Sequence, residues 1–399
     1  MRPRPNPSLI RFPNNRRAAL AALVWFAAAA FSGRAVAAAE NRIVLNIEPG
    51  EGNPRNSEGA FLELRDGRIL FAYTRFYGGS GDEAGADIAA VHSSDQGLTW
   101  SRPPVILFKN DADENIMSVS LLRLQDGRIA IFYLKKNHLN DCRLYMRISG
   151  DEGKSWGLPV LTIPAPGYFV VNNDRVIQLG SRRLVVPAAF HRFRGGDSKD
   201  YKNFDGRGIA IFFLSDDGGA TWRESDSWRA LGVDSQSGLR EPGVVELRDG
   251  RLFSWSRTDR GCQYGMTSGD GGITWDAPRP TGFKSPNSPL SMKRMPDGGD
   301  LLAVWNDHSG RFPVPRDFKW TAGRSPLVSA ISRDDGKTWE SFRQIESSLE
   351  GGYCYTAMAF VGRWVLLGYC AGDADTRGSL NRLRIRRVDR DWFYEGADR

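Results

Sequence analysis

One eight-residue pattern, Ser-x-Asp-x-Gly-x-Ser/Thr-Trp, occurs five times in this chain and constrains its fold more than any other feature. The copies are SSDQGLTW, SGDEGKSW, SDDGGATW, SGDGGITW and SRDDGKTW, which end at Trp100, Trp156, Trp222, Trp275 and Trp339. Their aspartates, Asp95, Asp151, Asp217, Asp270 and Asp334, are 56, 66, 53 and 64 residues apart. A pattern that returns at such a period indicates a chain built from repeated structural units.

The pattern has the composition of a tight turn. Glycine supplies a backbone corner with positive φ, aspartate and Ser or Thr form hydrogen bonds with the local backbone, and tryptophan buries a large apolar ring. Five metal or ligand sites are the alternative, but a catalytic centre needs different residues in different roles. We therefore interpret the five copies, here called Asp boxes, as structural turns that join strands.

A second repeat lies between the boxes and consists of two β-rich runs around a tight turn. Its six copies are GAFLELRDGRILFAYTR (59–75), SVSLLRLQDGRIAIFYLKK (118–136), DRVIQLGSRRLVVPAAFHR (174–192), GVVELRDGRLFSWSR (243–257), SMKRMPDGGDLLAVWND (291–307) and TAMAFVGRWVLLGYC (356–370). Four of them contain Asp-Gly, the strongest short signal for a β-hairpin. Each unit therefore reads as strand, turn, strand, loop, strand, box, strand.

Six such units in a row predict an all-β protein, a six-bladed β-propeller with five Asp boxes that spans residues 41–399. The sixth box is missing because the chain ends soon after LNRLRIRRV, the third strand of the last blade. We expect RIVLNIE, residues 42–48, to supply the fourth strand of that blade and close the ring.

The formal charge of +7 does not indicate a nucleic-acid partner, because six arginines and no acidic residue lie in residues 1–37. The rest of the chain carries 48 Lys and Arg against 47 Asp and Glu and shows no polybasic patch.

The first 37 residues have the features of a signal peptide. Arg16 and Arg17 precede an apolar run, residues 18–31, that is too short to span a bilayer comfortably, and Ala35-Val36-Ala37 offers a cleavage site. The alternative is an uncleaved membrane anchor. We expect export to the periplasm or the exterior, a mature N-terminus near Ala38 and no membrane insertion after cleavage.

No cofactor or metal site is expected. The four cysteines show no C-x-x-C spacing and the four histidines no ligand spacing, and we interpret the acidic run 111–115 as a solvated loop rather than a calcium site. Cys354 and Cys370 flank one hairpin at nearly equal distances from its turn, so they form either a cross-strand disulfide or two buried thiols.

One end of a propeller's channel collects the starts of the innermost strands and the ends of the second strands, so polar residues there are the candidates for chemistry. At the starts these are Ser57, Glu58, Ser118, residues 172–175, Arg240, Glu241, Asn287, Ser288, Tyr353 and Tyr355, and at the ends Arg75, Lys135, His191, Arg257 and Asp307.

With these motifs the chain resembles the sialidase (neuraminidase) family over nearly all of its length after residue 37. ILFAYTRFYGGSGDEAGADIAAV resembles the stretch with the family's acid/base aspartate, which implies Asp82. REPGVVELRDGRLFSWSR resembles the segment with the catalytic glutamate and, sixteen residues later, a carboxylate-binding arginine, which implies Glu241 and Arg257. A further arginine eight residues before the box serine implies Arg324, and GYCYTAM resembles the segment of the nucleophilic tyrosine, either Tyr353 or Tyr355.

The resemblance fails at one position. The family has an arginine at the start of the first innermost strand, where this chain has SEGA, with Ser57 at the arginine position and Glu58 beside it. The three-arginine clamp on a substrate carboxylate is then incomplete unless Arg75 or Arg175 substitutes from a neighbouring position, and Glu58 is expected to face the same pocket.

The implied chemistry is coherent. A sialoside carries a carboxylate at its anomeric carbon, which repels a carboxylate nucleophile, whereas a neutral tyrosine avoids the repulsion and needs a base, Glu241. Asp82 then protonates the leaving oxygen and activates water. The resemblance thus implies an exported, retaining exo-sialidase acting on a glycan. The alternatives are a hydrolase or lyase for another acidic or deoxy sugar and a non-catalytic glycan-binding propeller.

Overall fold

The computed structural model describes residues 39–296, 299–316 and 319–395. The predicted signal peptide lies outside these ranges. Within them the regular secondary structure is almost entirely β-strand, with two short 3-10 helices, η1 (Tyr201–Asn203) and η2 (Arg390–Phe393), so the all-β prediction is confirmed. The described part of the chain contains no helical segment that could cross a lipid bilayer.

Four of the sheets are four-stranded and antiparallel. The first holds β2 (Arg55–Glu63), β3 (Ile69–Phe76), β4 (Ala86–Ser93) and β5 (Val105–Phe108), the second β15 (Arg240–Glu246), β16 (Leu252–Arg257), β17 (Cys262–Ser268) and β18 (Arg279–Lys284), and the third β19 (Ser291–Arg294), β20 (Leu301–Asn306), β21 (Leu327–Ser332) and β22 (Glu340–Glu346). The fourth holds β23 (Gly352–Val361), β24 (Trp364–Gly372), β25 (Leu383–Asp389) and β1 (Asn41–Ile47).

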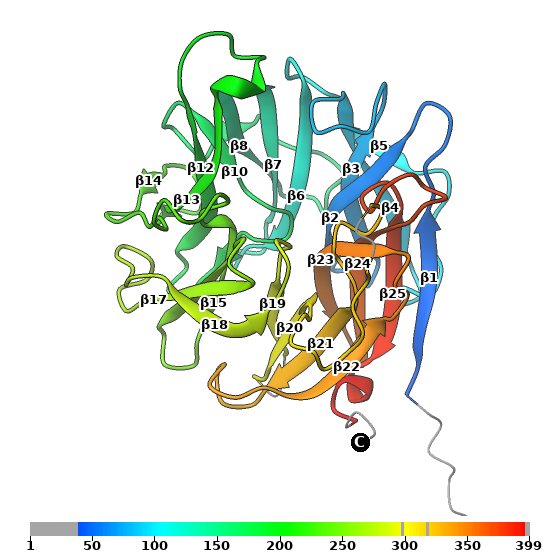
Figure 1. Cartoon of the computed structure of the whole chain (residues 1–399). Coiled ribbons are helices and arrows are strands. Elements are labelled where there is room, and N and C mark those ends of the chain that lie inside the picture. Colours follow the sequence, from blue (N-terminus) through cyan, green and yellow to red (C-terminus); the bar gives the residue numbers. More distant parts are fainter. Residues whose placement is uncertain (1–38, 297–298, 317–318, 396–399) are drawn as a thin grey trace, which may run out of the picture. The chain divides into compact units, whose positions relative to one another are not determined.

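The fourth sheet joins the two ends of the described chain. β1 pairs antiparallel with β25, from Arg42 opposite Arg387 to Ile47 opposite Leu383. Figure 1 shows the two strands, blue and red, side by side. The predicted pairing of residues 42–48 with the last unit is therefore present.

A nine-stranded sheet occupies the place where two separate sheets were expected. It comprises β6 (Asn115–Arg123), β7 (Ile129–His138), β8 (Asp141–Ser149), β9 (Val160–Leu161), β10 (Tyr168–Val170), β11 (Ile177–Gln178), β12 (Leu184–Phe193), β13 (Phe204–Ser215) and β14 (Arg223–Glu224). The short strand β10 pairs with both β8 and β12 and so connects the second and third units. All six predicted hairpins are antiparallel pairs.

Each of the five repeats forms the same hydrogen-bonded turn. In the first, the Ser93 hydroxyl donates to Asp95 at 2.8 Å, Gly97 N–H donates to the Ser93 hydroxyl at 2.9 Å, and the Thr99 hydroxyl donates to Asp95 at 2.6 Å. The other four repeats make the same contacts. These hydrogen bonds join polar groups of the turn to one another, and the tryptophan ring packs against apolar neighbours. Trp275, for example, packs on Phe212 of the neighbouring sheet with ring centroids 4.0 Å apart.

Candidate active site

A pocket of about 190 Å³ brings together five of the nine predicted site residues. They are Glu58 from β2, Asp82 from the loop after β3, Glu241 from β15, Arg257 from the end of β16 and Tyr355 from β23. These residues come from four distant parts of the sequence, so their meeting at one pocket is a demanding test of the sequence interpretation.

Three of these side chains project from β-bulges at the start of a strand. The register shifts between Ser57 and Ala60 in β2, and corresponding shifts occur in β15 and β23. One residue at each bulge has positive φ: Glu58 at 55°, Glu241 at 47° and Tyr355 at 58°. Non-glycine residues rarely adopt this conformation, and it costs about 1–3 kcal/mol each. A bulge re-aims a side chain, and here each of the three lines the pocket.

Tyr355, Glu241 and Arg257 are joined by two hydrogen bonds and one ion pair. The Tyr355 hydroxyl donates to Glu241 Oε1 at 3.2 Å, Arg257 Nη1 lies 3.2 Å from Glu241 Oε2, and the same Nη1 donates to the Tyr355 hydroxyl at 3.3 Å. All three side chains are buried. Glu241 Oε1 thus accepts a hydrogen bond, whereas the buried Oε2 has an ion-pair contact with Arg257 and no hydrogen bond. The predicted contact between Glu241 and a tyrosine hydroxyl is present.

The electrostatics of this group keep the tyrosine neutral. Burial raises the pKa of Tyr355, and the Glu241 carboxylate raises it further, against the opposing charges of Arg257 and Arg324. The hydroxyl therefore needs a base in order to act as a nucleophile. Glu241 is in contact with it and can accept the proton.

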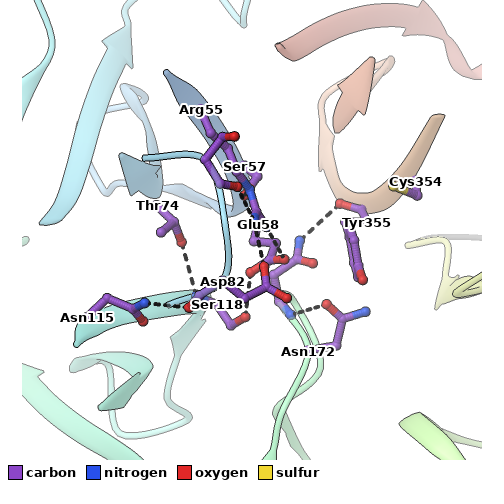
Figure 2. Close-up of polar contacts among 12 residues, drawn as sticks. Arg55, Ser57, Glu58, Thr74, Asp82, Asn115, Ser118, Asn172, Cys354 and Tyr355 are labelled. Atoms are coloured by element: carbon purple, nitrogen blue, oxygen red, sulfur yellow. Dashed lines mark hydrogen bonds and ion pairs between the residues drawn. The ribbon is translucent and has the colours of Figure 1, made fainter. Parts of the chain in front are cut away.

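Arg55 contacts two carboxylates of the pocket, and the sequence interpretation missed it. Its Nη1 donates to Asp82 Oδ1 at 2.6 Å and its Nη2 to Glu58 Oε1 at 3.3 Å, and its guanidinium lies over the Phe76 ring. Figure 2 shows Arg55, Glu58 and Asp82 converging on one space, with Ser118 donating to Glu58 Oε2 at 2.7 Å. The expectation that the first innermost strand has no arginine at its start is therefore corrected, because β2 begins at Arg55, two residues before Ser57.

The two carboxylates that share Arg55 have different environments. Asp82 is 61% exposed; although burial alone would raise its pKa, Arg55 holds that pKa below its usual range. Glu58 is 5% exposed, and burial raises its pKa to about 7 in spite of Arg55. Glu58 thus faces the pocket as expected, but it pairs with Arg55 rather than with Arg257 or Arg324.

The loop that carries Asp82 is anchored by its backbone. Asn115 Nδ2 donates to the carbonyls of Asp82 and Ala84 at 2.7 and 2.9 Å, and the buried Lys136 ammonium donates to the Asp82 carbonyl at 3.1 Å. The Asp82 backbone is therefore fixed while its carboxylate remains open to the pocket.

Four predicted residues lie outside the pocket lining. Arg324 is half-buried beside the pocket, with its guanidinium 5.3 Å from the Tyr355 ring centroid and its Nη1 donating to Cys354 Sγ. Arg175 is buried over Trp255 and donates to the Leu290 carbonyl. Arg75 lines a separate surface hollow with Tyr77 and Asp87, so neither Arg75 nor Arg175 completes a clamp here.

Of the two candidate tyrosines, Tyr353 does not line the pocket. It packs in a hydrophobic cluster with Tyr369 and Met358, away from the pocket. The bulge after Cys354, with Tyr355 in the left-handed conformation, breaks the alternation that would have placed both rings on one face. Tyr355 is the tyrosine at the site.

The other wall of the pocket is aromatic and apolar, and of its residues only His191 was a candidate from the sequence. It includes Tyr168, His191, Tyr201, Phe204, Met117 and Leu134. Tyr168 and His191 each lie within about 5 Å of the Phe204 ring, at centroid distances of 4.9 and 5.3 Å. Burial lowers the pKa of His191 to about 3, so this ring is neutral and belongs to the apolar wall. The wall suits a substituent without charge.

Within the described residues, no three His, Cys, Asp or Glu side chains gather as a metal site would require. In the acidic run 111–115, Asp111 pairs with Lys135 at 2.9 Å and Asp113 with His138 at 3.3 Å.

Comparison with known families adds to this geometry. Residues 56–363, well over half of the chain, match the BNR repeat-like domain. The chain belongs to the BNR repeat-like family. Two curated relatives of this BNR protein are an anhydrosialidase of Macrobdella decora, 30% identical over 206 residues, and a sialidase of Bacteroides fragilis, 24% identical over 234 residues. The resemblance to sialidases is therefore confirmed.

These alignments cover 49% and 55% of this chain but only 23% and 38% of the two relatives. Solved structures match more of the BNR protein. A leech intramolecular trans-sialidase has a TM-score of 0.66 at 16% identity and covers 89% of this chain, which spans 71% of that one. A Dyadobacter fermentans protein of unknown function has a TM-score of 0.67 at 18% identity, with 88% and 99% covered. At these identities the likeness shows a shared sialidase fold.

Proposed function

We propose that this protein is an exo-sialidase-type glycoside hydrolase that releases a terminal acidic sugar from a glycan with retention of configuration. The observation that carries the proposal is the contact between the Tyr355 hydroxyl and Glu241 at 3.2 Å in a buried pocket. A binding protein has no need for a buried phenol in contact with a carboxylate base, whereas a nucleophile does.

In the proposed reaction Tyr355 attacks the anomeric carbon while Glu241 takes its proton. Arg257 contacts both groups, so it holds the phenol and the carboxylate in register and stabilises negative charge as it forms on the phenol. The bond from the anomeric carbon to the leaving oxygen breaks as the bond to Tyr355 forms, which gives a covalent glycosyl–tyrosine intermediate. Water then attacks from the face that the leaving group vacated, opposite Tyr355, breaks the bond to the tyrosine and releases the sugar with its original configuration.

Asp82 is the proposed acid and base, and Arg55 controls when it can act. While Arg55 binds Asp82, the pKa of that carboxyl stays low and it remains ionised. A substrate carboxylate that competes for Arg55 would release Asp82, whose pKa would then rise towards the range in which it can protonate a leaving group. Binding of a substrate carboxylate to Arg55 would thus allow Asp82 to act as the acid catalyst.

A second candidate is hydrolysis of an acidic or deoxy sugar other than ordinary sialic acid. The observation that favours it is the pairing of Arg55 with two carboxylates, Asp82 and Glu58, which leaves less of its charge for a substrate. Arg257 also pairs internally, with Glu241. A sugar that does not need several arginines to bind a carboxylate group would suit such a pocket.

The proposal includes an architecture and a location. We take the sheets as six blades of a propeller stapled by five Asp boxes, with β6–β9 and β11–β14 as two blades joined by β10. The six hairpins, the repeated box hydrogen bonds and the pairing of β1 with β25 support this arrangement. Residues 1–37 are proposed to direct export and to be removed.

The test is release of an aryl group from a panel of aryl glycosides that includes an α-sialoside and other acidic and deoxy sugars. The sialidase proposal predicts turnover of the sialoside, and turnover of another sugar alone would favour the second candidate. Folded protein that cleaves none of them would refute both and leave a glycan-binding role. Product analysis separates hydrolysis from the intramolecular transfer for which the leech relative is named.

A further inference from the structure

Two buried cysteines lie next to the pocket, one of them adjacent in sequence to Tyr355. Cys354 of β23 is directly opposite Cys370 of β24 in the antiparallel register. The two are 1% and 0% exposed and form one small cluster with Tyr355. Directly opposed residues have Cα atoms about 4.5–5.5 Å apart, inside the range of about 4.4–6.8 Å that a disulfide spans.

The other two cysteines cannot take part. Cys142 lies on β8 opposite Lys136, and Cys262 lies on β17 opposite Lys284, each in a different sheet from Cys354. The register therefore specifies a single pair among the four free thiols.

We propose that Cys354 and Cys370 are a redox modification site, which closes to a cross-strand disulfide when the chain folds in the presence of a small-molecule or protein disulfide. The thiolate of Cys354 attacks one sulfur of that disulfide and releases its other half as a thiol. The thiolate of Cys370 then attacks the mixed disulfide and releases the second thiol. Two protein thiols are oxidised and one external disulfide is reduced to two thiols.

In the folded protein Arg324 contacts the sulfur of Cys354. Its Nη1 donates to Cys354 Sγ, and although burial alone would raise the pKa of that thiol, the hydrogen bond from Cys370 and the guanidinium charge lower it. Burial raises the pKa of Cys370 well above its ordinary value, so Cys354 is the more acidic thiol of the two in the folded protein. Because both sulfurs are buried in the folded protein, the exchange takes place while β23 and β24 come together.

Oxidation would affect the pocket through its effect on Arg324. In the reduced state Arg324 is held by Cys354 Sγ and lies over the Tyr355 ring. Oxidation bonds the Cys354 sulfur to Cys370 and leaves it a weak acceptor, so the hold on Arg324 is loosened. If the proposed function holds, oxidation should raise KM for a sialoside by about 3- to 10-fold, the worth of a typical hydrogen bond, and reduction should restore it.

The thiol test needs no substrate. Full-length protein is unfolded with reductant, refolded with reduced and oxidised glutathione, unfolded again in iodoacetamide and digested with trypsin. Cleavage after Arg363 separates Cys354, in peptide 344–363, from Cys370, in peptide 364–377. The proposal predicts a linked pair of these peptides, with alkylation of Cys142 and Cys262 only.

Four alkylated cysteines, or a link to Cys142 or Cys262, would overturn the site. The Cys142→Ser variant should keep the link and Cys370→Ser should lose it; the wild-type experiment decides the question even if a variant fails to fold. A disulfide that forms without changing KM of an active enzyme would overturn the coupling through Arg324. Absence of activity in both redox states would instead refute the proposed function and leave the peptide result standing.

Discussion

Replacing Glu241 by glutamine should abolish most of the turnover while leaving substrate binding in place. Glutamine keeps the size of the side chain and can still accept a hydrogen bond from Tyr355, but it cannot take the proton. An unperturbed phenol with a pKa of about 10 is ionised to roughly one part in a thousand at pH 7, and burial raises the pKa of Tyr355 above that value. Loss of the Glu241 charge lowers the pKa again in part. Turnover should therefore fall by about 10²–10⁴-fold, or about 3–5 kcal/mol of barrier.

The assay is initial rates with an aryl sialoside over a range of pH. In the Glu241→Gln variant the rate should climb with pH by about tenfold per unit, because Tyr355 must then ionise without a base. KM should stay level or fall, since Arg257 loses its internal partner and becomes available to a substrate carboxylate.

The matched control is Glu246→Gln on the same strand, whose carboxylate accepts from Gly180 N–H outside the pocket. That variant should match the wild type. A Glu241→Gln enzyme within twofold of the wild type, or with an unchanged pH profile, would refute the assignment of Glu241 as the base.

Four further predictions follow from the site. The pKa of Glu58 moves from 4.5 to about 7 on folding, so the folded state binds the extra proton and the free energy of unfolding should fall by about 3 kcal/mol as pH rises from 4.5 through 7. The free energy of unfolding of Glu58→Gln, measured with urea, should not show this decline. Equal declines in the variant and the wild type would contradict the prediction. Arg55→Gln should raise the pKa of Asp82, which is measured by following the ¹³C chemical shift of its carboxyl group with pH. An unchanged pKa would show that the ion pair with Arg55 does not cause the low value. Tyr353→Phe should keep turnover within a few-fold, since this ring packs away from the pocket, and a 10²-fold loss would reverse the choice of tyrosine. Mass spectrometry of exported protein should give a mature N-terminus near Ala38, and an intact Met1 would contradict cleavage.

Most of the fold could be predicted from the repeats in the sequence. Asp-Gly turns and alternating apolar residues predicted each hairpin, because these signals depend only on local backbone chemistry. The sixteen-residue spacing from Glu241 to Arg257 succeeded for the same reason, since both residues belong to one hairpin. β10 was missed because three residues are too few to show an alternation of apolar and polar side chains. This strand connects the second and third units within the nine-stranded sheet.

The failures at the site come from counting residues back from a hairpin turn, which assumes turns of equal length. Two residues separate the last paired positions of β23 and β24, whereas five separate those of β2 and β3 and of β15 and β16, so the count favoured Tyr353 over Tyr355. The count also placed Ser57 at the arginine position and so passed over Arg55, where β2 begins. Glu58 and Tyr355 adopt positive φ, for which neither residue type has a preference, so composition gives no signal there. The aromatic wall depends on η1 and β10 folding back over the pocket, which only tertiary structure reveals.

The central claim is that Tyr355 is the nucleophile, and covalent trapping tests it most directly. A sialosyl fluoride with a second fluorine beside the anomeric carbon slows breakdown of a glycosyl-enzyme intermediate, and tryptic mass spectrometry then locates the adduct. The structure predicts the sugar on Tyr355, in peptide 344–363. An adduct on Asp82, Glu58 or Tyr353, or turnover of the fluoride with no adduct on any residue, would contradict it.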